Sequence, residues 1–167
     1  KELENKLRIK DSPGWNIQKA INDIKQNKGE IINIQFRLFD IRKTFYTGQS
    51  SGFIGRTRDS VMQSMLKDNI GLVFKRTGRI YGSSFDFFFV SKYPISEGLF
   101  VIDPLGREYL APLYLTLDHK GQQSLDDTGS RQPNLNMQIV DKVAEKLGLK
   151  FTPEKMEDAL TIAPVDL

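Results

Sequence analysis

Phe85-Asp86-Phe87-Phe88-Phe89-Val90 is the stretch that decides the fold class, because aromatic and β-branched residues at this density are typical of a β-strand. The stretches around it have the same character and end at turn residues such as Asp103-Pro104-Leu105-Gly106. They predict further strands at residues 30–36, 41–46, 69–74, 99–102 and 108–117. The middle of the chain is therefore expected to form a mixed or largely antiparallel sheet.

Helices are expected on both sides of this sheet. Apolar residues recur at helical spacing over residues 14–27, over 57–66 with Thr57 as N-cap, and over 135–147 with Gly148 as the C-terminal cap. Thr152 followed by a proline predicts the start of one more helix. Strands in the middle with flanking helices predict an α+β fold.

Length and composition predict one domain and exclude several classes of protein. The chain has 167 residues, of which 39% are hydrophobic, so it has enough apolar material for a core and is not a disordered tail. It has no cysteine and one histidine, His119, which excludes disulfides, thiol catalysis and histidine-rich metal sites. No apolar run is long enough to span a membrane. We expect a lead-in over residues 1–14 and a single domain over 15–167.

Charge is distributed unevenly along the chain, whose net charge is +3. Residues 42–92 carry nine Lys or Arg against three Asp, whereas residues 93–167 carry seven against twelve acidic residues. The middle third is therefore the part that could present a cationic face. The chain begins at Lys1 without a methionine or a signal peptide, so we expect a fragment of a longer cytoplasmic protein.

Two groups of residues offer weak signals of chemistry. Asp103, Asp118 and Lys120 follow the order of a metal-dependent nuclease site, in which two carboxylates hold the cation, but both segments also suit simple loops. Asp11-Ser12-Pro13-Gly14-Trp15 has the acidic, proline and aromatic residues of amino-methyltransferase motifs without their second proline, and suits a helix cap. For the isolated His119, a solvated loop residue is the simpler interpretation.

Basic residues interleaved with aromatic ones give the strongest functional signal. Lys and Arg can neutralise phosphates, and Arg can also bind guanine through two hydrogen bonds. A solvated face, with basic side chains lying over apolar neighbours, is the alternative interpretation. The residues that predict DNA contacts in this way are Arg42, Lys43, Arg56, Arg58, Lys75, Arg76, Arg79 and Tyr81.

Several ordered blocks resemble the signatures of single-polypeptide restriction–modification enzymes, the Type ISP and related fused Type II families. Arg37-Leu38-Phe39-Asp40-Ile41-Arg42 followed by Phe45-Tyr46 is similar to their Arg-Pro-Phe-Asp-x-Arg…Tyr-Tyr motif, with Leu38 in place of the usual proline. The later blocks that match are Gly52 to Leu72, Pro112 to Leu115, Arg131 to Asn136 and Leu147 to Thr152. Together they cover about residues 15–155.

The resemblance implies a target recognition domain that follows an adenine-N6 DNA methyltransferase domain in a bacterial enzyme. The fragment would have no catalytic residues, no metal and no cofactor, whereas its parent would use S-adenosylmethionine, and magnesium and ATP if it translocates along DNA. The expected partners are double-stranded DNA and the methyltransferase domain of the same parent chain, with no membrane. An alternative is a docking module that packs against the methyltransferase core.

The resemblance also separates the candidate residues by role. Arg37, Phe39 and Asp40 fall in the tight motif, where a structural Asp–Arg pair that holds the turn competes with DNA contact. Residues 75–84 fall between matched blocks, where members with different targets are expected to differ. The candidates for reading bases are therefore Arg76, Arg79, Tyr81, Ser83 and Ser84.

Overall fold

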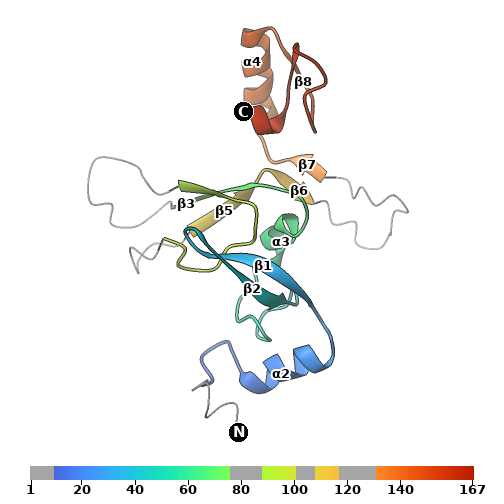
Figure 1. The fold of residues 1–167 in the computed structure, drawn as a ribbon. Helices are drawn as coiled ribbons and strands as arrows, with labels where there is room; N and C mark the ends of the chain where they lie inside the picture. The colour runs from blue at the N-terminus through green and yellow to red at the C-terminus, as the bar shows by residue number, and fades with distance from the viewer. Residues whose placement is uncertain (1–9, 76–87, 101–107, 117–130) are drawn as a thin grey trace, which may run out of the picture.

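The computed structural model of the chain describes residues 10–75, 88–100, 108–116 and 131–167, and these form an α+β fold (Figure 1). The strands are β1 (Glu30–Arg37), β2 (Asp40–Tyr46), β3 (Gly71–Lys75), β4 (Phe88–Ser91), β5 (Glu108–Pro112), β6 (Tyr114–Thr116), β7 (Arg131–Pro133), β8 (Lys150–Phe151) and β9 (Thr161–Ile162). The α-helices are α2 (Ile17–Lys25), α3 (Asp59–Met62) and α4 (Met137–Leu147), with 3-10 turns at Gln63–Met65 and Pro164–Asp166. The predicted fold class is confirmed.

An antiparallel hairpin of β1 and β2 joins the first helix to the rest of the fold. Its register runs from Glu30 opposite Tyr46 to Arg37 opposite Asp40, so the connection is only the pair Leu38 and Phe39. The register shifts between Gln35 and Arg37, which is a β-bulge close to the tip. Such a bulge increases the local twist and redirects the side chains that follow it.

An antiparallel three-stranded sheet in the order β4-β3-β5 forms the middle of the molecule. Successive side chains of a strand point to opposite faces, so Val73 lies on one face while Leu72 and Phe74 lie on the other. The Val73 face is buried, whereas Leu72 and Val90 on the opposite face are exposed. We call this second face the outer face; it consists of Leu72, Phe74, Phe88, Val90, Tyr109 and Ala111.

The core lies on the inner face of this sheet. Its buried centre is a cluster of Val73, Ile95, Leu99 and Phe100. Residues from four other elements pack against that centre: Leu38, Met62, Phe89 and Leu110. The hairpin tip, α3 and the sheet therefore share one core.

The two ends of the chain add separate layers, with α2 at one end of the molecule and α4 with β8 at the other (Figure 1). Asn16 caps α2 by accepting a hydrogen bond from the Lys19 N–H at 3.1 Å. Asn136 caps α4 in the same way, and Gly148 ends it at a φ of 67°. The prediction of Gly148 as the cap is confirmed, because glycine takes this left-handed conformation without strain.

The helix predicted from Thr57 is shorter than expected and begins later. Arg58 precedes α3, which is a single turn continued by a 3-10 turn. Thr57 is buried, and its hydroxyl lies 3.3 Å from the Ser50 hydroxyl and 3.4 Å from the Gly48 carbonyl oxygen. Its oxygen is therefore used to hold the preceding loop and does not cap a helix.

Other predicted elements are also corrected. The Thr152 hydroxyl donates to the Lys155 carbonyl at 2.8 Å, and turns lead from there to β9 where a helix was expected. Leu99 and Phe100 are in a bend with both side chains buried in the core, and the rest of that predicted strand lies outside the described residues. The strand predicted over residues 108–117 is interrupted at Leu113, where β5 ends and β6 begins.

Candidate nucleic-acid interface

A loop from the end of β2 to α3 carries Arg56 and Arg58, and both of its ends are fixed. At the α3 end, the Tyr46 hydroxyl donates to Asp59 Oδ1 at 2.7 Å. Burial of the Tyr46 phenol, together with this bond to a carboxylate, raises the Tyr46 pKa well above its usual value. The backbone N–H of Thr57 donates to the Ser50 hydroxyl at 3.2 Å. The two arginines therefore emerge from a backbone that the hairpin and the loop itself hold in place.

Helix α2 fixes the other part of this loop. The Trp15 indole N–H donates to the Phe53 carbonyl at 2.8 Å, and the Phe53 backbone N–H donates to Asp23 Oδ2 at 2.8 Å. The Phe53 ring meets the Phe45 ring edge-on, with centroids 5.6 Å apart. Gly52 lies against the Asp23 carboxylate, where a Cβ would collide with it. The sequence motif Gly52-Phe53 is thus explained by close packing against α2.

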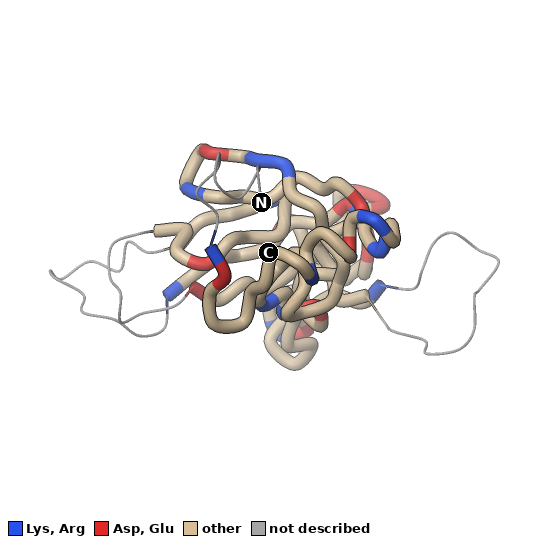
Figure 2. Tube along the Cα trace, turned by 90° about the horizontal axis from the view of Figure 1, so that it is seen from below, with Lys and Arg blue, Asp and Glu red and all other residues tan. Residues whose placement is uncertain are grey.

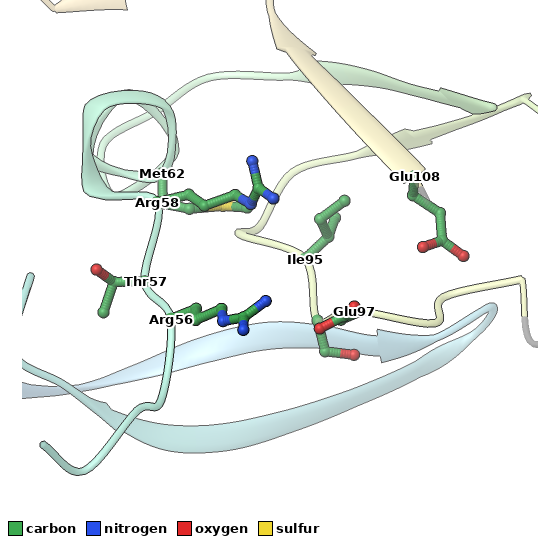
Figure 3. A pocket seen from close by; sticks show the side chains of 8 residues that line it. Arg56, Thr57, Arg58, Met62, Ile95, Glu97 and Glu108 are labelled. Carbon is green, nitrogen blue, oxygen red and sulfur yellow. The ribbon is translucent and has the colours of Figure 1, made fainter. Parts of the chain in front are cut away.

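A cavity of about 90 Å³ opens beside Arg56 and Arg58 (Figure 3). The two guanidinium groups point across it toward the side where Ile95 and Glu97 lie. The Glu108 carboxylate accepts the backbone N–H groups of Gly98 at 3.2 Å and Phe100 at 3.1 Å, so it orders the loop that forms the far wall. The lining residues are Arg56, Thr57, Arg58, Met62, Ile95, Ser96, Glu97 and Glu108.

A wider groove of about 530 Å³ continues from this cavity toward the N-terminal end of the fold. It shares Arg56, Thr57 and Ile95 with the smaller cavity, and Trp15 and Phe53 add aromatic surface to its lining. The combination of guanidinium and aromatic groups suits a ligand that has both anionic and flat apolar parts.

Arg56 and Arg58 are both exposed, and within the described part of the chain their side chains make no hydrogen bond or ion pair. Arg58 has a φ of 49°, a left-handed conformation that non-glycine residues seldom adopt. Unpaired guanidinium groups on a fixed backbone can bind an anion without first breaking an internal contact. These two residues are therefore the best-placed cations of the predicted set.

The cations of the hairpin tip are already engaged with their neighbours. Arg42 forms an ion pair with Asp40, in which Nη2 and Oδ2 are 2.8 Å apart, and its guanidinium lies 3.9 Å from the centre of the Phe36 ring. Arg37 lies 4.1 Å from the same ring centre and donates to the Phe36 carbonyl. The Asp–Arg pair of the motif therefore joins Asp40 to Arg42, two residues along the same strand face, and leaves Arg37 to hold the bulge.

Phe39 occupies the tip itself and is 89% exposed. Its φ of 63° is left-handed, which costs an L-residue about 1–2 kcal/mol. Its ring touches Phe89 edge-on at 5.9 Å between centroids, whereas Leu38 is the tip residue that packs into the core. The sequence motif does not distinguish these two neighbours; only the structure shows which one is presented outward.

The remaining predicted residues divide into three groups. Lys43 is exposed on β2 without a partner among the described residues. Lys75 ends β3 and is only 6% exposed, so its position does not favour direct contact with a ligand. The residues predicted to read bases lie outside the described residues: Arg76, Arg79, Tyr81, Ser83 and Ser84. Basic and acidic residues are interspersed along the described trace (Figure 2).

Arg131 has a structural role that the sequence did not reveal. Its guanidinium forms an ion pair with Glu154 at 2.6 Å, donates to the Asp68 carbonyl at 2.8 Å and lies 4.1 Å from the centre of the Tyr114 ring. The hydrogen bond from Arg131 lowers the pKa of the Glu154 carboxyl below its usual value. Arg131 thus links β7 to the segments before β3 and after β8. Its position in a matched sequence block was the only available signal.

The nuclease candidates Asp103, Asp118 and Lys120, and the single histidine, lie outside the described residues. Within the ranges that the structure describes, no three His, Cys, Asp or Glu side chains come together as metal ligands. None of the helices in these ranges is long and apolar enough to cross a membrane.

Comparison with known proteins identifies the family. The model of a family described as the Type ISP C-terminal specificity domain matches residues 1–158 of the 167-residue chain. No curated protein and no solved structure matches the chain. The match covers the hairpin, the loop with Arg56 and Arg58, the three-stranded sheet and α4.

Proposed function

The chain belongs to the family of Type ISP C-terminal specificity domains, the target recognition modules of restriction–modification enzymes, and we propose that it binds duplex DNA and reads the target site of its parent enzyme. The family match over residues 1–158 carries this proposal. The exposed, unpaired cations of the β2–α3 loop support it, because phosphate contacts position a protein on DNA before base contacts select the sequence.

In the proposed complex, the DNA phosphates are neutralised by Arg56, Arg58 and Lys43. Arg42 adds a cationic edge to the hairpin but keeps its Asp40 pair, so its contribution is smaller. We leave Lys75 out of this surface because it is buried. Base reading is assigned to the segment that follows β3, with Arg76, Arg79, Tyr81, Ser83 and Ser84 as the residues to test.

Catalysis belongs to the parent enzyme in this proposal. The parent would methylate adenine with S-adenosylmethionine and would cleave DNA with magnesium, and with ATP if it translocates. The specificity domain itself would bind none of these. We expect the protein to act in the bacterial cytoplasm, where its DNA substrate is found.

The test is a fluorescence-anisotropy titration of the 167-residue chain with a pool of random duplexes at several salt concentrations. Sequencing the bound fraction then identifies any enriched motif. We expect affinity to fall steeply with salt, since binding releases the counterions condensed on the phosphates. Arg56→Ala and Arg58→Ala should each weaken binding to all sequences and lower the salt slope by about one.

Lys142→Ala is the matched control, because Lys142 is an exposed cation on α4 with no partner among the described residues. It should leave both the affinity and the salt slope unchanged. Absence of binding even at low salt would contradict the proposal for this chain. Equal effects of Lys142→Ala and Arg56→Ala would contradict the assignment of the surface.

Association with the rest of the enzyme is a second role, favoured by the apolar outer face of the sheet. Leu72, Phe88 and Val90 are exposed there side by side on paired strands, and the Phe74 and Tyr109 rings stack with centroids 5.9 Å apart. The methyltransferase domain would cover this face. Val90→Asp should then abolish co-purification of the chain with the remainder of its parent, while the free chain keeps its salt-dependent DNA binding.

A further inference from the structure

The tip of the β1–β2 hairpin presents an aromatic side chain where folding gives no reason for one. Phe39 is 89% exposed and has a φ of 63°. Glycine or asparagine would fit this backbone with less strain, and a polar side chain would be better solvated. Apart from the edge of Phe89, no ring of the described residues contacts it. Strained and exposed residues of this kind are concentrated at functional sites.

The backbone beneath Phe39 is held on both sides, so the ring is presented from a fixed base. Leu38 is anchored in the core beside it. The Gln35 side-chain amide donates to the Arg37 carbonyl at 2.8 Å, and the Gln35 backbone pairs with Pro94 and Ser96 at 2.8 and 3.0 Å. A ligand that contacts Phe39 would therefore meet an ordered tip, with little further loss of backbone entropy.

The surroundings of the ring select the chemistry of its partner. Arg37 and Arg42 stack on Phe36 just behind the tip, Arg42 while paired with Asp40, and Lys43 follows Arg42 on β2 without a partner among the described residues. A projecting aromatic ring backed by cations is complementary to a polyanion that also has flat apolar surfaces. Nucleic acid has both, because phosphates flank stacked bases.

We propose that Phe39 is a wedge that inserts beside a base step of bound duplex DNA and locally unstacks it. This inference rests on the proposed DNA-binding function and adds a distortion of the DNA to it. Insertion would favour pyrimidine–purine steps, which unstack most easily, and would thus give sequence preference at a step that no polar side chain reads.

The experiment places 2-aminopurine at successive positions of a duplex that the wild-type chain binds, and records its fluorescence. Unstacking should raise the signal at one step. Phe39→Ala should abolish that rise and weaken binding about tenfold, as the loss of one stacked base does, without changing the salt slope. Phe39→Leu, which keeps an apolar wedge, should retain most of both effects. Thermal melting should show that both variants remain folded, since the ring is outside the core.

The outcomes separate this inference from the proposed function. Salt-dependent binding by the wild type without a change at any 2-aminopurine position, or an unchanged signal with Phe39→Ala, would overturn the wedge and leave DNA recognition standing. No binding by the wild type would overturn both. Normal DNA distortion by Phe39→Ala, together with lost association with the rest of the enzyme, would assign Phe39 to a protein interface and overturn the wedge.

Discussion

At the scale of single residues, the Arg131–Glu154 pair shows how one guanidinium can join distant parts of the chain. Both partners are partly exposed, so solvent weakens the ion pair itself. The geometry compensates, because the guanidinium donates to both carboxylate oxygens of Glu154 and also to the Asp68 carbonyl. The stabilisation by Arg131 therefore comes from three contacts together: the ion pair with Glu154, the hydrogen bond to the Asp68 carbonyl and the Tyr114 ring beneath the guanidinium.

Glu154→Gln should destabilise the fold by about 0.5–1 kcal/mol near neutral pH and have little effect in acid. The folded-state pKa of Glu154 is lowered from its ordinary 4.5, so the stabilisation is present above that value and is lost as pH falls through the folded-state pKa. Urea unfolding at several pH values would measure it. Glu157→Gln is the matched control, and an equal effect there would show that the pair contributes nothing specific.

Sequence patterns nominated the charged residues of the candidate site but could not assign their partners. Asp40 and Arg42 are two positions apart on β2 and therefore share a face, but the predicted strand began at residue 41, so this pairing emerged only from the structure. The free guanidinium groups of Arg56 and Arg58 could not be predicted, because they depend on two contacts across the loop, between Tyr46 and Asp59 and between Ser50 and Thr57. The buried position of Lys75 follows from a strand that ends one residue later than predicted.

At the scale of elements, the hairpin and α3 act as one unit because a buried hydroxyl joins them. Tyr46→Phe removes the bond to Asp59 and should cost about 1 kcal/mol, a typical net value for one hydrogen bond. The loop with Arg56 and Arg58 should then lose order, and DNA affinity should fall without a change in net charge. Thermal melting and anisotropy titration would measure the two effects.

The pH dependence of this contact provides an independent check. The raised folded-state pKa of Tyr46 gives stability that is fully present below the ordinary value of 10 and is lost as pH rises through the folded-state value. Tyr46→Phe should remove that alkaline loss. Tyr93→Phe is the control, because no hydrogen bond of the Tyr93 hydroxyl is found within the described residues. Equal alkaline sensitivity of both variants would contradict the role of Tyr46.

Elements with strong periodicity were predicted well, and those decided by tertiary contacts were not. The spacing of apolar residues located α2 and α4, and Gly148 confirms the predicted C-terminal cap, whereas the N-caps Asn16 and Asn136 were not predicted. The segment after Thr57 has helical spacing too, but only one α-helical turn forms before the chain tightens into a 3-10 turn. The chain after Thr152 returns as β9 to pair in parallel with β8, a contact between strands that the local sequence pattern does not predict.

At the scale of the whole molecule, the sheet has two apolar faces, and the described residues build a core on only one of them. The hairpin tip and α3 cover the inner face, through Leu38 and Met62. The alternation of side chains along β3 does not reveal which face of the sheet the hairpin tip and α3 cover, because Leu72 and Phe74 are as apolar as Val73. An apolar outer face on a folded domain is typical of a surface that meets another domain.

The same substitution on each face tests this arrangement directly. Val73 is 0% exposed and Val90, on the neighbouring strand, is 57% exposed. Val73→Ala should lower the free energy of unfolding by about 2 kcal/mol through lost burial and a cavity, whereas Val90→Ala should cost less than about 0.5 kcal/mol. The two changes remove the same side-chain atoms, so their difference in urea unfolding reports mainly burial, with a smaller contribution from the central position of β3 and the edge position of β4. Equal losses would mean that the outer face is already covered within the chain, and would remove the basis for placing the methyltransferase domain there.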